Sequence, residues 1–142
     1  KYNNQTGLWE FTCQHGPNEC YGNLVETCSI FKLEKRKSDE FIHCMETKIS
    51  SMAKDFNKTM AFCLKNDQES LKLIKKCVVS KEGNLYEHQI ADKTPKDKTY
   101  VPWITVNGKH NKTEENEIIA RLMNYIKKHY PSNQEDKLKF LS

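Results

Sequence analysis

The sequence predicts an α+β fold in which a helical part is held together by disulfide bonds. Apolar residues recur at intervals of three and four in several stretches, which is the spacing of one face of an α-helix. One apolar run precedes the pair Asn107-Gly108, a combination typical of a tight β-hairpin turn. The six cysteines are an even number and suit three disulfides. With 142 residues, 37% hydrophobic and 30% charged, the chain is long enough for one domain with a thin core.

The first helix is predicted from Pro17 to about Leu33. Residues 1–8 are polar and predict an arm or loop, and the apolar run Leu8–Thr12 predicts an edge strand. Proline suits the first helical turn, where its missing N–H would have no partner in any case. Four residues share one face of this helix: Leu24, Val25, Cys28 and Phe31. Burial of Cys28 on that face favours a disulfide to a neighbouring segment over a free thiol.

A second helix carries the most regular apolar stripe in the chain. Ser38 is the predicted N-cap, with Asp39 and Glu40 in an acidic first turn. The stripe consists of Phe41, Met45, Ile49, Met52 and Phe56, with Cys44 at its edge. Such a stripe predicts core packing more often than a binding groove.

A short segment, Thr59–Leu64, leads to a third helix that Asp67 is predicted to cap. Its inward-facing residues are Leu71, Ile74 and Val78, with Leu73 and Cys77 adjacent. Cys63 and Cys77 flank the break between these segments and could close a small loop. Six cysteines can pair in many ways, however, and the sequence does not choose among them.

The last part of the chain predicts a weak helix, a hairpin and a final helix. Gly83–Ala91 is the weak helix, with His88 at its surface, and residues 92–99 form a polar loop containing Pro95. Val101–Val106 is a predicted strand, with Trp103 and Thr105 on one face and Ile104 and Val106 on the other, before the Asn107-Gly108 turn. Thr113 is the predicted cap of the final helix, with Glu114, Glu115 and Glu117 in its first turn. The predicted buried face consists of Ile118, Ile119, Leu122, Ile126 and Tyr130, and Pro131 ends the helix before a polar tail at 131–142.

The segment Cys13–Cys20 gathers two sulfurs, the imidazole of His15 and the carboxylate of Glu19. It is open to three interpretations: a disulfide anchor, two ligands of a metal site, or a reactive thiol beside a histidine. A second close cysteine pair, which a zinc site needs, is missing. A reactive Cys20 needs a pKa depressed by the helix N-terminus. His15 itself is either a base beside Cys13 or, as we expect, a turn histidine bonded to backbone, whose replacement by Ala would impair folding or secretion.

Charge and short motifs indicate where the protein works. The net charge is +4, with one basic run at Lys32, Lys35, Arg36 and Lys37 and a looser one at Lys93, Lys96, Lys98, Lys109 and Lys112. These runs are either solvated faces or a patch for an anionic partner, and no nucleic-acid motif accompanies them. Glycosylation sequons stand at Asn4, Asn57 and Asn111 and predict the secretory pathway. No signal peptide or membrane span is recognisable, so we expect a mature or trimmed product.

Two motifs in register resemble one known family. Cys13-Gln14-His15-Gly16-x-x-x-Cys20 stands between Trp9-Glu10-Phe11 and Val25-Glu26-x-Cys28, and Tyr100–Gly108 follows far downstream. Both motifs are similar to hallmarks of the gamma-interferon-inducible lysosomal thiol reductases (GILT). Cys44, Cys63 and Cys77 fall where that family has a helical insertion, so the resemblance covers about residues 9–126.

The resemblance implies an incomplete or atypical thioredoxin-like fold in a single domain, 1–142, with the helical insertion at about 36–82 and the hairpin and helix at about 100–130. It also implies that Pro102 follows a cis peptide bond and that Tyr100, Val101, Pro102 and Trp103 form the substrate-side loop. The family's chemistry requires a Cys-x-x-Cys upstream of the signature, but no two of these six cysteines stand three positions apart. We therefore expect either a natural protein longer than these residues or a divergent member that packs differently.

The expected function is that of a secreted or lysosomal GILT-like glycoprotein that uses all six cysteines as structural disulfides: Cys13, Cys20, Cys28, Cys44, Cys63 and Cys77. It would bind a protein or cell-surface ligand, including an anionic one, without catalytic residues of its own and without a metal or cofactor. Nucleic acid is not an expected partner. The alternative is a GILT-type thiol-disulfide reductase whose Cys-x-x-Cys lies outside this sequence.

Overall fold

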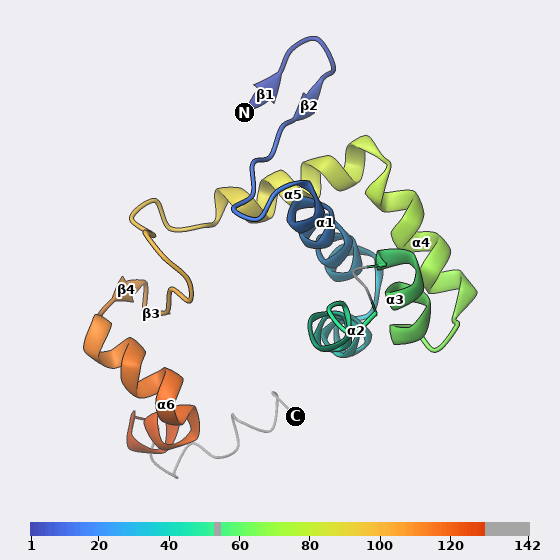
Figure 1. Ribbon diagram of the computed structural model, residues 1–142. Helices are drawn as coiled ribbons and strands as arrows, with labels where there is room; N and C mark the ends of the chain where they lie inside the picture. The colour runs from blue at the N-terminus through green and yellow to red at the C-terminus, as the bar shows by residue number, and fades with distance from the viewer. Residues whose placement is uncertain (53–54, 130–142) are drawn as a thin grey trace. The chain divides into compact units, whose positions relative to one another are not determined.

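The computed structural model describes residues 1–52 and 55–129 and divides the chain into two compact units, Lys1–Thr94 and Pro95–Ser142 (Figure 1). All three disulfides lie in the first unit. Most of the described residues are helical, and the two sheets among them are both two-stranded and antiparallel. The fold is therefore α+β, with helices dominant. No described helix has the length and apolar character needed to cross a bilayer.

The first unit begins with a hairpin rather than with the expected arm. Strand β1 (Tyr2–Asn3) pairs with β2 (Leu8–Trp9), so the predicted strand is shorter than Leu8–Thr12 and has a partner upstream. The side chain of Asn3 accepts hydrogen bonds from the backbone N–H groups of Gln5 (2.9 Å) and Thr6 (3.2 Å), which closes the turn. That local bond explains why a polar segment is folded.

Five helices complete this unit: α1 (Pro17–Lys32), α2 (Lys35–Lys48), α3 (Phe56–Cys63), α4 (Gln68–Val78) and α5 (Lys81–Asp92). Helix α1 is central, because it packs against α2, α4 and α5 (Figure 1). Its face carries Val25 and Cys28, both fully buried, as predicted. Leu24 is half-buried and Phe31 is partly exposed. The fully or nearly fully buried core around α1 consists of Val25, Cys28, Phe41, Met45, Met60, Ile74 and Cys77.

Helix α2 starts earlier and ends earlier than its apolar stripe predicts. Glu34 is the N-cap, since its carboxylate accepts bonds from the N–H groups of Arg36 (3.1 Å) and Lys37 (3.3 Å). The predicted cap, Ser38, is instead buried, with its hydroxyl 3.0 Å from that of Ser29 on α1. The hydroxyl of Ser38 is thus close to a residue of another helix and does not cap α2.

The same stripe continues past a helix boundary. Asp55 caps α3 by accepting from the N–H of Lys58 (3.0 Å), so Phe56 belongs to α3. The short Thr59–Leu64 segment is therefore the body of that helix. Helix α4 begins where predicted, with Asp67 accepting from Glu69 (3.0 Å) and Ser70 (3.1 Å).

Helix α5 is confirmed, with Ser80 as its cap, and begins two residues before the predicted Gly83. His88 is not a free surface histidine, because its ring stacks on Trp9 with centroids 3.5 Å apart. The backbone of Trp9 also exchanges two 2.8 Å bonds with the amide of Asn84. These contacts fasten the N-terminal hairpin to α5.

In the second unit, β3 (Thr105–Val106) pairs with β4 (Lys109–His110) through the predicted turn. Asn107 and Gly108 both have positive φ, 51° and 76°, as that turn requires. The strand itself is shorter than Val101–Val106. Residues 100–104 form a loop that is held by side chains instead.

Helix α6 (Lys112–His129) is capped by Asn111 rather than by Thr113. The Asn111 side chain accepts from the N–H groups of Thr113 (2.9 Å) and Glu114 (3.1 Å). Ile118 is buried as predicted, but Ile119 and Leu122 are 54% and 51% exposed. The backbone leaves helical geometry at Arg121 (φ −154°, ψ 64°), so one continuous apolar stripe cannot describe both halves of this segment. Ile126 is half-buried, whereas Tyr130 and the predicted tail at 131–142 lie outside the described residues.

Candidate functional site

The segment before α1 is a disulfide-closed turn. Cys13 and Cys20 are bonded, with their Cα atoms 5.6 Å apart, and Gly16 takes a positive φ of 88° immediately before Pro17. The N–H of Gly16 donates to the carbonyl of Cys13 at 3.2 Å. Of the three interpretations of this segment, the structure shows the disulfide. In that state neither sulfur is a nucleophile or a metal ligand.

His15 projects from this turn into solvent, with 82% of its side chain exposed. Its Nδ1 lies 3.2 Å from a carboxylate oxygen of Glu19, and the same oxygen accepts from the His15 backbone N–H at 2.5 Å. The expected bond from this imidazole to backbone is therefore wrong, because the carboxylate one helical turn ahead takes its place. Gln14, the other polar residue of the signature, is also exposed.

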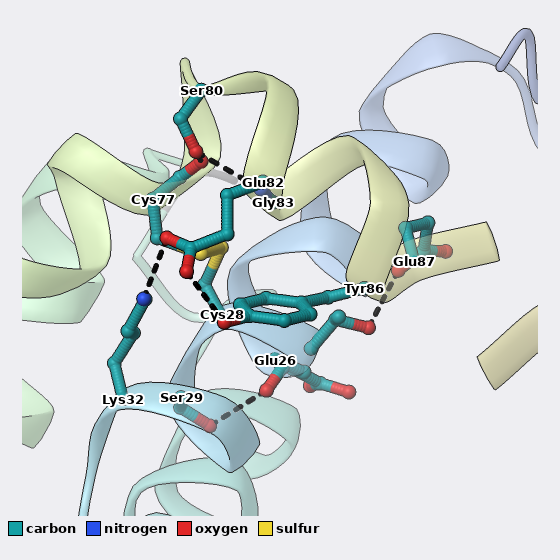
Figure 2. The surroundings of a disulfide bond; sticks show 11 residues. Glu26, Cys28, Ser29, Lys32, Cys77, Ser80, Glu82, Gly83, Tyr86 and Glu87 are labelled. Atoms are coloured by element: carbon teal, nitrogen blue, oxygen red, sulfur yellow. Dashed lines mark hydrogen bonds and ion pairs between the residues drawn. A yellow bond between two sulfur atoms is a disulfide. The ribbon is translucent and has the colours of Figure 1, made fainter. Parts of the chain in front are cut away.

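The remaining four cysteines bridge helices. Cys28 on α1 is bonded to Cys77 on α4, and both are almost completely buried (Figure 2). Cys44 on α2 is bonded to Cys63 on α3. A Cys63–Cys77 loop is therefore excluded, because each of these sulfurs bonds to a cysteine from another helix. All six cysteines are among the described residues, and none is free.

The start of α5 packs closely against the Cys28–Cys77 disulfide. Ser80 donates to the carbonyl of Cys77 (2.7 Å) and accepts from the N–H of Gly83 (2.9 Å), as Figure 2 shows. A Cβ atom on Gly83 would lie 2.2 Å from that carbonyl oxygen and 3.2 Å from the Cys28 sulfur. Only glycine allows α5 to approach the disulfide this closely.

Charged side chains cover the same region. Lys32 on α1 donates to Glu82 on α5 at 2.6 Å, and the hydroxyl of Tyr86 donates to the other oxygen of that carboxylate at 2.6 Å (Figure 2). These two bonds lower the pKa of Glu82 below its ordinary value. The ring of Tyr86 stacks on Phe31 with centroids 4.0 Å apart. The disulfide is thus a covered structural link.

The first basic run is largely neutralised by its neighbours. Besides the Lys32 pair, Lys35 lies 2.7 Å from Asp39 and Arg36 lies 3.1 Å from Glu40. Lys37 pairs with Asp67, and this hydrogen bond, with those from Ser70, holds the pKa of Asp67 well below its usual range. The run as a whole is therefore a poor match for an anionic partner.

The second unit contains a side-chain cluster that the sequence analysis did not identify. Glu115, 1% exposed, accepts from four groups: Lys112 Nζ (2.6 Å), the Tyr100 hydroxyl (2.9 Å), the Ile104 N–H (3.1 Å) and His110 Nε2 (3.2 Å). These interactions, led by the Lys112 hydrogen bond, lower the pKa of Glu115 to about 2. The carboxylate therefore fixes the loop at 100–104 to the start of α6.

This loop contains the residues assigned to the substrate side. The Val101–Pro102 peptide bond is cis. Trp103 stacks on His110 with ring centroids 3.7 Å apart, and its indole N–H is buried without a hydrogen-bond partner among the described residues. Val101 is 65% exposed. The sequence spacing could have predicted that Tyr100 and His110 lie near each other around the hairpin. It could not have predicted that the buried carboxylate of Glu115 bonds to both.

The three sequons lie at accessible positions. Asn4 is in the turn between β1 and β2, Asn57 is in the first turn of α3, and Asn111 caps α6, and all three are exposed. Glycan attachment at these sites stays a prediction. Among residues 1–52 and 55–129, no group of three or more His, Cys, Asp or Glu side chains is arranged to hold a metal ion.

Comparison with known proteins gives consistent results. The family model described as gamma interferon inducible lysosomal thiol reductase (GILT) matches residues 1–67. The chain is 39% identical over 111 residues to the gamma-interferon-inducible lysosomal thiol reductase of Mus musculus, covering 75% of this chain and 43% of that protein. The protein of the same name from Carassius auratus is 37% identical over 125 residues, covering 84% of this chain and 47% of the relative. GILT-like protein 1 of Drosophila melanogaster is 30% identical over 115 residues, covering 72% and 46%.

The chain thus spans about half the length of the curated relatives it matches. The residues matched by the family model include the Cys13–Cys20 segment, which the structure shows to be a closed turn at the start of α1. On these grounds the chain belongs to the gamma-interferon-inducible lysosomal thiol reductase family.

Proposed function

We propose that this chain is a secreted or lysosomal GILT-like glycoprotein that binds a protein or cell-surface partner and whose own cysteines do not exchange. One observation carries the proposal: all six cysteines are paired in three disulfides, and no two stand three positions apart. Reducing a disulfide requires a thiolate that attacks it and a second thiol that resolves the mixed disulfide. These 142 residues contain no such pair in the oxidised state.

We further propose that the residues belong to one thioredoxin-like domain in which the loop at Tyr100–Trp103 faces the partner. Two observations support this proposal. The side chain of Val101 in this loop is exposed, and the buried carboxylate of Glu115 holds the loop through hydrogen bonds from Tyr100 and Ile104. A rigid loop with an exposed apolar tip suits recognition of an extended peptide.

For an anionic partner, we propose α4 rather than the first predicted basic run as the contact surface. Lys72, Lys75 and Lys76 line one surface hollow together with Gln68 and Leu71. By contrast, Lys35, Arg36 and Lys37 are each paired with a carboxylate. Three neighbouring ammonium groups on one helix would favour a sulfated glycan through charge complementarity.

Binding and turnover can be measured separately. The oxidised chain should bind a heparin column, and replacing Lys72, Lys75 and Lys76 by Gln should shift its elution to clearly lower salt. The matched triple change of Lys35, Arg36 and Lys37 should shift it less. At about pH 5 the chain should not reduce a disulfide-bonded protein that the mouse relative reduces. Turnover by the chain, or equal elution shifts for the two triple variants, contradicts the respective part of the proposal.

A second candidate is thiol-disulfide reduction with an exchanging pair that is not among these six cysteines. The relatives from Mus musculus and Carassius auratus are thiol reductases by name, which favours this candidate, as does the cis peptide bond before Pro102 that the family resemblance implied. Under this proposal, the product isolated from its natural source should reduce a disulfide-bonded protein at acidic pH. The 142-residue chain alone should not.

A further inference from the structure

Carboxyl groups from three helices converge beside the middle of α1. The carboxyl groups of Glu26 on α1 and Glu46 on α2 line one cavity and lie within hydrogen-bonding reach of each other, and Glu87 on α5 lies close enough to repel the charge of Glu26. Glu26 is half-buried, whereas Glu46 is exposed. Glu87 is 8% exposed and accepts from the hydroxyl of Thr27 at 2.5 Å. Figure 2 shows Glu26 and Glu87 on their facing helices. Two carboxyl groups bond to each other only when at least one is protonated.

Among the described residues that line the cavity of Glu26 or shift its pKa, none is a cation. It lines a cavity of about 160 Å³ together with Glu19, Glu46 and the apolar side chains of Met45, Ile49 and Phe56. The charged groups facing it are therefore Glu19 on its own helix, Glu46 on α2 and Glu87 on α5, while α3 contributes only an apolar ring. All of these charges are negative.

Desolvation and these neighbours act in the same direction. Burial, then the hydrogen bond to Glu46, then the charges of Glu46 and Glu87 raise the pKa of Glu26 to about 8. Like-charged carboxylates in contact cannot both ionise without a large cost, so one retains a proton.

We propose that Glu26 and Glu46 share one proton and form an acid-dependent link between α1 and α2 that strengthens the helical unit in acidic compartments. The function of this link is structural and is independent of any redox activity. The carboxyl group of Glu26 binds a proton more readily in the folded chain than in the unfolded chain, where its pKa has the ordinary value of 4.5. Its stabilising contribution is therefore complete below about pH 4.5 and is lost as the pH rises toward 8.

Thermal unfolding of the 142-residue chain between about pH 5 and pH 8.5 tests this proposal. The melting temperature of the native sequence should fall as the pH rises. Glu26→Gln, which keeps a donor toward Glu46 without an ionisable proton, should flatten that dependence. Glu40→Gln, an exposed glutamate of α2 bonded to Arg36, is the matched control and should leave the dependence unchanged.

A spectroscopic measurement covers the case in which Glu26→Gln does not fold. Infrared difference spectra at about pH 7 should show the carbonyl stretch of a protonated carboxyl group in the native chain. Because burial is the largest cause of the raised pKa, Glu26 should keep its proton in Glu46→Ala, but the band should shift in frequency because the hydrogen bond to Glu46 is lost. A native chain that lacks the band, or whose melting temperature has the same pH dependence as that of Glu26→Gln, overturns the proposal.

Discussion

Glu26 in the first unit and Glu115 in the second are the same residue type with opposite surroundings. Glu115 is surrounded by donors, including the ammonium group of Lys112, whereas Glu26 faces other carboxyl groups. Their pKa values accordingly move apart, to about 2 and about 8. Acid therefore favours the folded state through Glu26 and disfavours it through Glu115, and the neighbours of each carboxyl group decide which.

The two units also differ in what holds them together. All three disulfides lie in Lys1–Thr94, where they join α1 to α4, join α2 to α3 and close the turn before α1. In Pro95–Ser142 the corresponding link between loop and helix is the carboxylate of Glu115. Disulfide bonds resist pH changes and break under reduction. A carboxylate cluster resists reduction and is weakened by a pH change.

Removing the buried disulfide should have the largest effect. Replacing Cys28 and Cys77 by Ala should reduce the free energy of unfolding of the helical unit by about 2–5 kcal/mol, because the link closes a long loop. The loss should appear as faster amide hydrogen exchange in α1 and α4. Exchange in β3, β4 and α6 should stay the same, because none of the three disulfides lies in their unit, and acceleration there would show that this disulfide supports the second unit as well.

The next largest effect is expected from Gly83→Ala. Its Cβ atom would meet the Cys77 carbonyl oxygen at 2.2 Å, so α5 must shift away from the disulfide. Overpacking of this kind costs about 1–3 kcal/mol. Chemical denaturation should show the loss, with Leu85→Ala as the control, since Leu85 lies on the same helix and is 47% exposed. Equal midpoints for the two variants would show that the close approach has no energetic role.

Glu115→Gln should produce a smaller, pH-dependent change in the second unit. The folded pKa lies below the ordinary value of 4.5, so the stabilising contribution is present above about pH 4.5 and is lost as the pH falls toward 2. In the native chain, the protection of the amides in 100–104 from hydrogen exchange, corrected for the pH dependence of the intrinsic exchange rate, should therefore fall in acid. In the variant this protection should be low already at neutral pH and change little on acidification. An unchanged acid response in the variant would remove Glu115 as the cause.

His15→Ala should have the smallest effect, within about 0.5 kcal/mol, because exposed residues without buried partners rarely matter more. The sequence alone led us to expect impaired folding, and the 82% exposure of this side chain revises that expectation. Thermal unfolding against the native chain is sufficient to test it. A large loss of stability would show that the Glu19 contact supports the turn.

Part of the local chemistry was readable from the sequence, and tertiary partners were not. The cap at Asp67 before α4 and the turn at Asn107-Gly108 are confirmed, whereas Asn111 rather than Thr113 caps α6. Ser38 has an equally good capping side chain, but its bond to Ser29 on another helix places it inside α2. The hydrogen-bond partner that decides the case is nine residues away in sequence.

The sites show the same division. The sequence predicted six structural cysteines and the turn before α1, but not which helices the disulfides join, because pairing depends on helix packing. It placed Glu115 in a first helical turn, where acidic residues are common, without any sign that the group is buried. The partial burial of Glu26 beside other carboxyl groups was hidden for the same reason.

The most direct test of this account is a count of reactive thiols while the chain is offered a client. The oxidised 142-residue chain is incubated at about pH 5 with a disulfide-bonded protein and a small dithiol, quenched with an alkylating agent, and its mass is measured. We predict that Cys28, Cys77, Cys44, Cys63, Cys13 and Cys20 all remain unmodified and that the client is reduced no faster than by the dithiol alone. Alkylation of any pair, together with faster reduction of the client, would contradict the assignment of these cysteines as structural.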